Sequence, residues 1–340
     1  MKDKDIKKIE PKAVTEIDNQ FDEVVLAIRT TRDDVLRQAN SKLISLYWQI
    51  GEYISKKITD AEWGDGVVVQ LANYISSTAP ELRGFSDKNL WRMKRFYETY
   101  RESDEKLSTL LREIGWSNNL TIVSRCKTDE ERRFYIQLCI SDGLTNRELN
   151  RQIDSALYER TRLNAPKLST ALREIIPETP HVFRDSYVLE FLGGSDAGEN
   201  TMRRGLVDQM KKFILELGKD FLFIGQEYRI QVGNSDFRID LLFYHRALNC
   251  LVAFELKTGK FRPEHIGQLN FYIEALDRDV KKPNENPSIG VLLCKDKDDE
   301  VVEYALSRSL SPTMVTEYQL HLPDKKLLQS KIKELEEETD

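Results

Sequence analysis

Apolar residues recur at helical spacing through the first half of the chain. Between residues 41 and 58 they return every three or four positions, which places them on one face of a helix. Similar patterns predict further helices at 67–78, 87–100, 129–142 and 145–162. Ser86 is a suitable N-cap for the helix at 87–100, because its hydroxyl can accept a hydrogen bond from a first-turn amide. The spacing therefore predicts an α-helical N-terminal domain over residues 1–165.

The pattern changes after a stretch that contains three prolines. Pro166, Pro177 and Pro180 interrupt the helical periodicity, so we interpret residues 166–180 as a linker. Beyond it the expected order is a helix, three strands, a helix, a strand and a helix, at 201–218, 228–232, 237–244, 250–257, 263–275, 289–294 and 298–309. The three consecutive strands are joined by short turns, which indicates an antiparallel meander. We expect an α/β domain over residues 181–330, with a mixed sheet flanked by helices, and a charged tail at 331–340.

The composition fits a protein with two globular domains. The chain has 340 residues, with 51 basic and 57 acidic side chains and a formal net charge of −6. No apolar run approaches the roughly 20 residues that a membrane helix needs, and the charged N-terminus lacks the apolar segment of a secretory signal. The four cysteines lie far apart, without the spacing of a zinc site, which indicates reduced thiols. We expect a cytoplasmic protein with no membrane partner.

Charged residues interrupt two of the apolar strands. Glu255 and Lys257 are two positions apart, so they share one face of their strand, and Asp240 lies among apolar residues in the preceding strand. A buried carboxylate costs several kcal/mol unless it meets a cation. If the two strands are neighbours, Asp240 and Glu255 converge on a divalent cation such as Mg²⁺, which prefers oxygen ligands. With Lys257 beside them, this arrangement favours phosphodiester hydrolysis.

The motif Asp240…Glu255-Leu256-Lys257 resembles the core of the PD-(D/E)XK nuclease superfamily. The resemblance implies a restriction-endonuclease-like fold in which Asp240, Glu255 and the backbone carbonyl of Leu256 hold Mg²⁺ or Mn²⁺. Lys257 would position or activate the attacking water. The next predicted helix carries Gln268 and Tyr272, like the Gln-x-x-x-Tyr pair of the superfamily, and the i and i+4 spacing puts both on one helix face. Gln268 would support catalysis and Tyr272 would contact the nucleic acid.

Longer runs extend this resemblance to nearly the whole chain. They are similar to the YhcG-type family of bacterial PD-(D/E)XK proteins at 239–246, 254–257, 267–272, 286–290 and 293–296, and to its N-terminal domain of unknown function at 46–51, 63–64, 83–86 and 89–90. The resemblance implies a nuclease-fold C-terminal half and a helical half that binds DNA or serves assembly.

One part of the pattern departs from the superfamily. Many members carry an acidic residue early in the helix before the strands, where it can help to hold metal. Here residues 202–206 read Met-Arg-Arg-Gly-Leu, and neither Glu199 nor Asp208 lies in the expected register. The helix therefore lacks the acidic residue at the expected place for a second metal ion, and Glu199 and Asp208 are the alternatives that could substitute for it. Asp236 shares a strand face with Asp240 and suits either metal binding or capping of the turn at 233–235.

Basic residues outside the motif are candidates for nucleic-acid contacts. Lys88, Arg92 and Arg95 lie on the predicted helix at 87–100, which with the helix at 67–78 is a candidate helix-turn-helix pair, although such basic faces are often simply solvated. Lys260 and Arg262 follow the motif and suit contacts with phosphates or with solvent.

The function predicted from these features is a Mg²⁺-dependent DNA endonuclease, acting in defence against foreign DNA or in DNA processing. One alternative is a nucleic-acid-binding or assembly protein whose nuclease fold is inactive or conditional, since a fold can outlive its chemistry. Another is a branched-DNA resolvase, which requires a two-fold homodimer.

Overall fold

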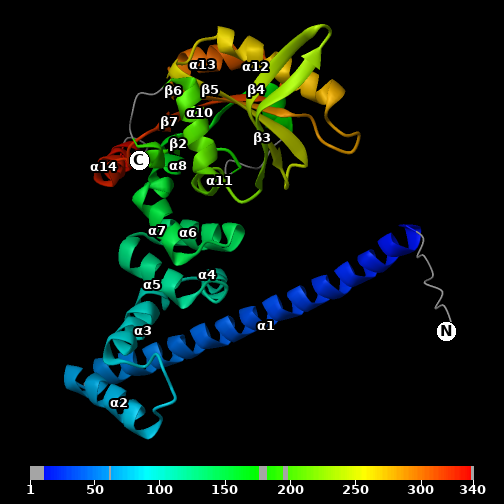
Figure 1. Cartoon of the computed structure of the whole chain (residues 1–340). Coiled ribbons are helices and arrows are strands. Elements are labelled where there is room, and N and C mark those ends of the chain that lie inside the picture. The colour runs from blue at the N-terminus through cyan, green and yellow to red at the C-terminus, as the bar shows by residue number, and fades with distance from the viewer. Residues whose placement is uncertain (1–10, 61–62, 176–181, 194–197, 338–340) are drawn as a thin grey trace, which may run out of the picture. The chain divides into compact units, whose positions relative to one another are not determined.

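The structure is a computed structural model that describes residues 11–60, 63–175, 182–193 and 198–337. The chain divides into two compact units, Met1–Asn146 and Arg147–Asp340 (Figure 1). The division falls earlier than the expected boundary after residue 165. The reason is that Arg151 and Arg160, from the stretch expected to end the helical domain, form ion pairs with Glu216 of the second unit.

The first unit is α-helical. Its helices are α1 (Pro11–Thr59), α2 (Asp65–Thr78), α3 (Asp87–Tyr100), α4 (Glu105–Leu110), α5 (Trp116–Arg125) and α6 (Asp129–Asp142). The helix expected at 41–58 is the C-terminal part of the much longer α1, and the helices expected at 67–78, 87–100 and 129–142 correspond to α2, α3 and α6. The prediction of a helical N-terminal region is therefore confirmed.

Helix α3 lies at the centre of this unit. Its N-cap is Ser86, as predicted, whose hydroxyl accepts a hydrogen bond from the Asn89 amide at 3.4 Å. One face is buried through Leu90, Met93, Phe96 and Tyr100. Helix α1 packs on α3 at Gly51, where a Cβ atom would lie 2.2 Å from the Met93 carbonyl oxygen. The close approach of the two helices therefore requires glycine at this position.

The second unit is built on a mixed sheet. Among the described residues, seven strands pair in the order β1-β7-β6-β5-β4-β3, with β2 beside β7. Strands β3, β4 and β5 form the expected antiparallel meander, whereas β5, β6 and β7 are parallel. The strands are β1 (Lys167–Leu168), β2 (Ser186–Val188), β3 (Phe221–Val232), β4 (Ser235–His245), β5 (Cys250–Lys260), β6 (Ile289–Asp296) and β7 (Thr313–Gln319).

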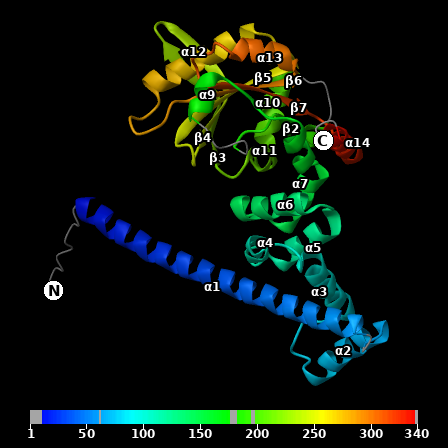
Figure 2. The same ribbon diagram turned by 180° about the vertical axis from the view of Figure 1, so that it is seen from behind.

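Helices cover both faces of this sheet (Figures 1 and 2). Apolar residues of α10 (Glu199–Asp208) and α11 (Met210–Leu217) join one buried cluster. Those of α12 (Glu264–Asp279) and α13 (Asp299–Leu306) join a second cluster on the opposite face. Gly290 of β6 lets α12 lie close to the sheet, because a Cβ there would be 2.5 Å from Ile273 Cδ1. The expected mixed sheet flanked by helices is thus confirmed.

Several elements differ from the sequence-based expectation. The single helix expected at 145–162 is two helices, α7 (Asn146–Asp154) and α8 (Leu157–Leu163), separated by Ala156 with a φ of 50°. The helix expected at 201–218 is likewise divided into α10 and α11 at Gln209. Strands β1, β2 and β7 were not expected.

Two regions given no structure by the sequence pattern contain helices. In the expected linker, β1 is followed by α9 (Thr170–Ile175), and residues 176–180 lie outside the described part of the chain. The expected charged tail overlaps α14 (Lys325–Glu337), which packs against α8. A short 3₁₀ helix, η1 (Glu190–Leu192), precedes α10. Within the described ranges, none of the helices combines the length and the apolar character that a membrane span needs.

Candidate active site

The strand register brings Asp240 and Glu255 together. The β4–β5 ladder ends at the pair Leu241 and Phe254, and Asp240 and Glu255 are the next residues along their strands. At this point the Leu256 amide donates a hydrogen bond to Asp240 Oδ2 at 2.9 Å. The Asp240 carboxylate is therefore held against the backbone of the neighbouring strand, next to the expected motif.

Glu255 is buried with one carboxylate oxygen unpaired. The residue is 3% exposed, and its Oε1 accepts a hydrogen bond from Lys257 Nζ at 2.8 Å. Its Oε2 is buried and finds no hydrogen-bond partner among the described residues. Burial, together with the charge of Asp240, raises the pKa of Glu255 to about 7. A buried oxygen of this kind, beside a second carboxylate, is suited to a cation.

The oxygen atoms at this point fit a divalent cation. Asp240, Glu255 and the Leu256 carbonyl would supply oxygen ligands, which are the kind that Mg²⁺ and Mn²⁺ prefer. Within the described ranges, no three or more His, Cys, Asp or Glu side chains are grouped so as to hold a metal by themselves. Backbone, water or substrate oxygens must therefore complete any coordination shell, as is usual for Mg²⁺ in phosphoryl chemistry.

Lys257 lies between two carboxylates. Besides its bond to Glu255, its Nζ is 3.8 Å from Glu199 Oε2. Burial opposes the charged ammonium, but the hydrogen bond and the charge of Glu255 outweigh it and raise the pKa of Lys257. Lys257 is therefore held in its cationic form. Glu199, which the sequence places outside the expected register, is the first residue of α10, and its carboxylate lies near the Lys257 ammonium.

Two further charged residues at the site were missed by sequence reasoning. Arg203 of α10 donates a hydrogen bond from Nη1 to Asp240 Oδ1 at 2.7 Å. Its Nη2 is 3.0 Å from Glu227 Oε1. Glu227 lies opposite Asp240, since the pairs on either side are Gln226 with Leu241 and Tyr228 with Ile239. The expected position of Glu227, before a strand beginning at 228, gave no reason to connect it with Asp240.

The predicted Gln268 and Tyr272 lie together on α12. Gln268 Nε2 donates a hydrogen bond to the Tyr272 hydroxyl at 2.8 Å. Burial raises the pKa of Tyr272, and the charges of Glu255 and Asp240 act in the same direction.

The other basic candidates are exposed. Lys260 lies at the end of β5, and Arg262 just beyond it is 3.5 Å from Glu264. Along α3 of the first unit, the i, i+4, i+7 spacing of Lys88, Arg92 and Arg95 places them on one exposed face. Helices α2 and α3 are separated by residues 79–86, a connection longer than the three or four residues of a helix-turn-helix turn, so that interpretation is wrong.

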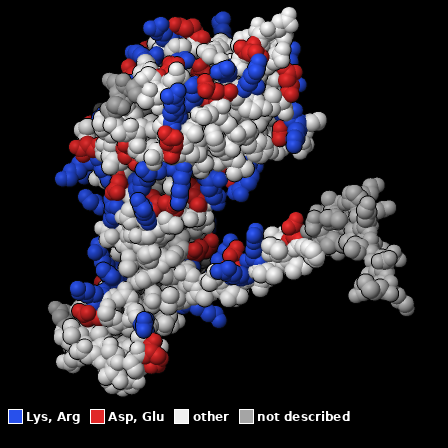
Figure 3. Space-filling model, viewed as in Figure 1, with Lys and Arg blue, Asp and Glu red and all other residues white. Residues whose placement is uncertain are grey.

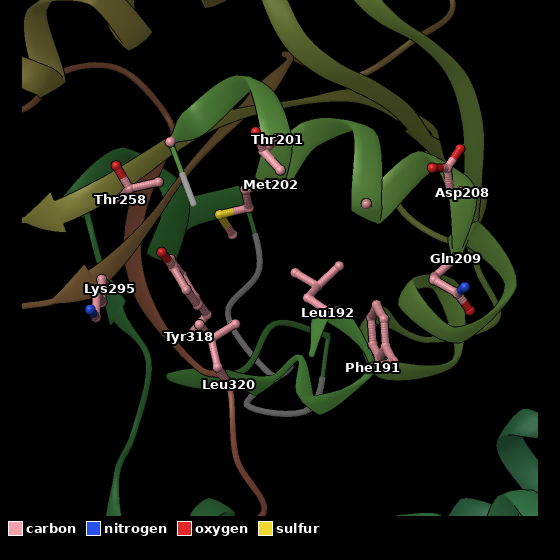
Figure 4. A pocket seen from close by; sticks show the side chains of 12 residues that line it. Phe191, Leu192, Thr201, Met202, Asp208, Gln209, Thr258, Lys295, Tyr318 and Leu320 are labelled. Carbon is pink, nitrogen blue, oxygen red and sulfur yellow. The ribbon is translucent and has the colours of Figure 1, made fainter. Parts of the chain in front are cut away.

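Neither the charge on the face that Figure 3 shows nor a pocket beside α10 adds a predicted residue to the site. On the face that Figure 3 shows, basic and acidic side chains are interspersed over the coloured surface. A pocket of about 520 Å³ lies beside α10, with Thr201 and Met202 on one side and Phe191, Leu192 and Tyr318 around it (Figure 4). Its described lining residues include none of the predicted site residues. The acidic site therefore does not coincide with this pocket.

Comparison with known proteins gives one match over most of the chain. Residues 23–160 match the model of the DUF1016 N-terminal domain, and residues 180–333 match that of the YhcG PDDEXK nuclease domain. YhcG of Escherichia coli (strain K12) is 31% identical over 346 residues, which cover 90% of this chain and 91% of that protein.

Solved structures give weaker likenesses. A repair endonuclease from Pyrococcus abyssi has 15% identity and a TM-score of 0.25, over 38% of this chain and 50% of that one. A complex of EndoMS with double-stranded DNA has 17% identity and a TM-score of 0.23, over 35% of this chain and 45% of that one. The match thus spans half or less of the length of each of these two proteins.

Proposed function

We propose that this chain, which belongs to the YhcG family of PD-(D/E)XK nucleases, is an endonuclease that uses Mg²⁺ or Mn²⁺ to hydrolyse phosphodiester bonds in DNA. The observation that carries the proposal is Glu255. Its carboxylate is buried with Oε2 unpaired among the described residues, next to Asp240 and 2.8 Å from the Lys257 ammonium. Such an arrangement is costly for stability alone, and it suits a cation and an anionic substrate.

The residues divide the work by their charge and position. Asp240, Glu255 and the Leu256 carbonyl would hold the cation, which when bound polarises the phosphodiester and lowers the pKa of coordinated water. Lys257, kept charged by Glu255, positions the attacking water and stabilises negative charge that develops on the phosphoryl group. Gln268 would fix the orientation of the Tyr272 hydroxyl, to which it donates a hydrogen bond at 2.8 Å.

Exposed basic side chains would bind the phosphates of the substrate. Lys260 and Arg262 follow Lys257 in the chain, so they are placed to contact phosphates next to the cleaved bond. In the first unit, Lys88, Arg92 and Arg95 offer a second set of phosphate contacts. Their contribution would be electrostatic, so binding should weaken as salt increases. Defence against foreign DNA or DNA processing suits such an activity.

The test is a cleavage assay on supercoiled, linear and branched DNA with Mg²⁺, with Mn²⁺ and with EDTA. We expect metal-dependent cleavage that falls by at least about 10³-fold, or about 4 kcal/mol in activation free energy, in Asp240→Asn and in Lys257→Met. Arg204→Gln, an exposed change on α10, is the matched control and should retain activity. Cleavage that is unchanged in both site variants would refute the assignment.

A second candidate function is favoured by one contact. Arg203 already neutralises Asp240, which suits a nuclease fold that is inactive or conditional in a nucleic-acid-binding or assembly protein. In that case the chain would bind DNA in a salt-dependent manner but would neither bind Mn²⁺ at millimolar concentration nor cleave any of the three substrates. Preferential cleavage of the branched substrate would instead indicate a resolvase.

A further inference from the structure

Both oxygens of the Asp240 carboxylate already have partners within the protein. Oδ2 accepts the Leu256 amide at 2.9 Å, and Oδ1 accepts Nη1 of Arg203 at 2.7 Å. The Asp240 and Arg203 side chains are only 15% and 11% exposed. The guanidinium is therefore a fixed part of the site and not a mobile surface group.

The same guanidinium joins Asp240 to a carboxylate on the neighbouring strand. Arg203 Nη2 lies 3.0 Å from Glu227 Oε1 and donates to Asn200 Oδ1 at 2.8 Å. Glu227, opposite Asp240 on β3, has a φ of 45°, a left-handed conformation that is uncommon for a residue other than glycine. The planar fork of arginine is suited to bridging two carboxylates in this way.

Without Arg203, Asp240 and Glu227 would form an acidic pair across two neighbouring strands. Carboxylates that face one another from separate strands are typical ligands of a hard divalent cation. This pair is distinct from the pair of Asp240 with Glu255, where the unpaired Oε2 lies. A fixed positive charge bonded to Asp240 and Glu227 repels any other cation from the space between them.

We propose that Arg203 takes the place of a second metal ion, so that the site binds one divalent cation, at Asp240 and Glu255, and no other. Arg203 is then a positioning residue that sets the metal number of the site. The inference rests on the proposed metal-dependent function, and it adds to that function the stoichiometry and the residue that determines it.

The test counts Mn²⁺ ions bound per chain, by calorimetry and by the electron paramagnetic resonance signal of free Mn²⁺. We expect one ion for the wild-type chain and two for Arg203→Gln, which removes the bridging charge from Asp240 and leaves Glu227 facing only the exposed Arg238, whose Nη1 lies 3.7 Å from its Oε1. Arg204→Gln, which changes an exposed arginine on the same helix, should still bind one ion. The double variant Arg203→Gln/Glu227→Gln should return to one ion, because the second acidic pair is then incomplete.

The number of Mn²⁺ ions bound by the wild-type chain can overturn the proposal even if Arg203→Gln does not fold. Two ions per wild-type chain would overturn the proposal, as would a single ion in an Arg203→Gln chain whose circular dichroism matches that of the wild type. If the wild-type chain cleaves DNA in a metal-dependent manner yet binds two ions, only this inference fails. If it binds no Mn²⁺ at all, both this inference and the proposed metal dependence fail.

Discussion

Two buried carboxylates in the second unit, Glu216 and Glu255, have opposite surroundings. Glu216 of α11 is fully buried and bonded through both oxygens: Oε2 accepts Arg151 Nη1 at 2.8 Å and Oε1 accepts the Val188 amide at 2.9 Å. Arg160 and Arg184 each lie 3.2 Å from Oε1. Glu255 has one lysine partner and an oxygen with none among the described residues.

The pKa values of the two groups show what this difference means. Burial alone would raise the pKa of Glu216, but its three arginines and the Val188 amide outweigh burial and lower the pKa to about 2. For Glu255, burial and the charge of Asp240 outweigh Lys257 and raise the pKa to about 7. Glu216 thus connects α7, α8 and β2 to α11 as a structural anion, whereas Glu255 lacks the positive charge that its burial calls for. A bound cation would supply that positive charge to Glu255.

The largest effect is expected from neutralising Glu216. Glu216→Gln keeps the shape of the side chain but leaves three guanidinium groups without their common counter-charge. Removing one partner from a buried ion cluster typically costs about 3–5 kcal/mol. We expect a loss of this size in the free energy of unfolding at pH 7, measured by urea denaturation. A loss below about 1 kcal/mol would show that the two carboxylates do not differ as described.

The second prediction concerns the pH dependence of stability without metal. Between about pH 4.5 and 7 the folded chain holds a proton on Glu255 that the unfolded chain has released, so the free energy of unfolding falls as pH rises through this range. Glu216 acts in the opposite direction, and its stabilisation is lost as pH falls from about 4.5 toward 2.

Urea denaturation in EDTA measures these slopes. In Glu255→Gln the free energy of unfolding should not fall as pH rises from 5 to 8. The difference in this free energy between Glu255→Gln and the wild type should therefore shift by up to about 3 kcal/mol in favour of the variant over that range. Glu216→Gln should keep the fall at neutral pH. Parallel pH profiles for the wild type and Glu255→Gln would contradict the raised pKa.

The third prediction is that bound Mn²⁺ supplies the positive charge that Glu255 lacks and so stabilises the folded chain. A ligand that binds only the folded chain, at 100 times its dissociation constant, adds about 2.7 kcal/mol to the free energy of unfolding. We expect Mn²⁺ to stabilise the wild-type chain in this way and to leave Glu255→Gln unchanged, as measured by thermal unfolding. A thermal shift of equal size in both proteins would place the cation elsewhere.

How far the sequence predicts this site depends on the distance over which each residue is positioned. Strand alternation and the order of elements predicted that Asp240, Glu255 and Lys257 would converge, because they lie on two strands, β4 and β5, that follow each other directly in the chain and pair with each other. Glu199 and Arg203 reach the site only because α10 starts at Glu199 and crosses β5. The sequence around Glu199 and Arg203 contains no pattern that predicts this packing of α10 on β5.

Other elements were not predicted, either because their pairing partners are far away in the sequence or because the local sequence contains no feature that marks them. Strand β7 is positioned by β6 and by β1 and β2, which lie more than a hundred residues earlier in the chain, so periodicity alone did not identify it. The break between α7 and α8 falls at Ala156, a residue that ordinarily favours helix. Here the ion pairs of Arg151 and Arg160 with Glu216 accompany the break, and tertiary contacts of this kind override local propensity.

The smallest effect is expected at Asp236, a carboxylate on the same strand as Asp240. It was a candidate for metal binding or turn capping, but the structure pairs it with Arg229 across the β3–β4 hairpin, and both side chains are exposed. Arg229 lowers the pKa of Asp236 through a hydrogen bond that water can replace. Asp236→Asn should therefore match the wild type in urea midpoint, Mn²⁺ binding and DNA cleavage. A loss of Mn²⁺ binding in this variant would mean that exposed carboxylates also hold the cation, and burial would then no longer be what distinguishes Glu255.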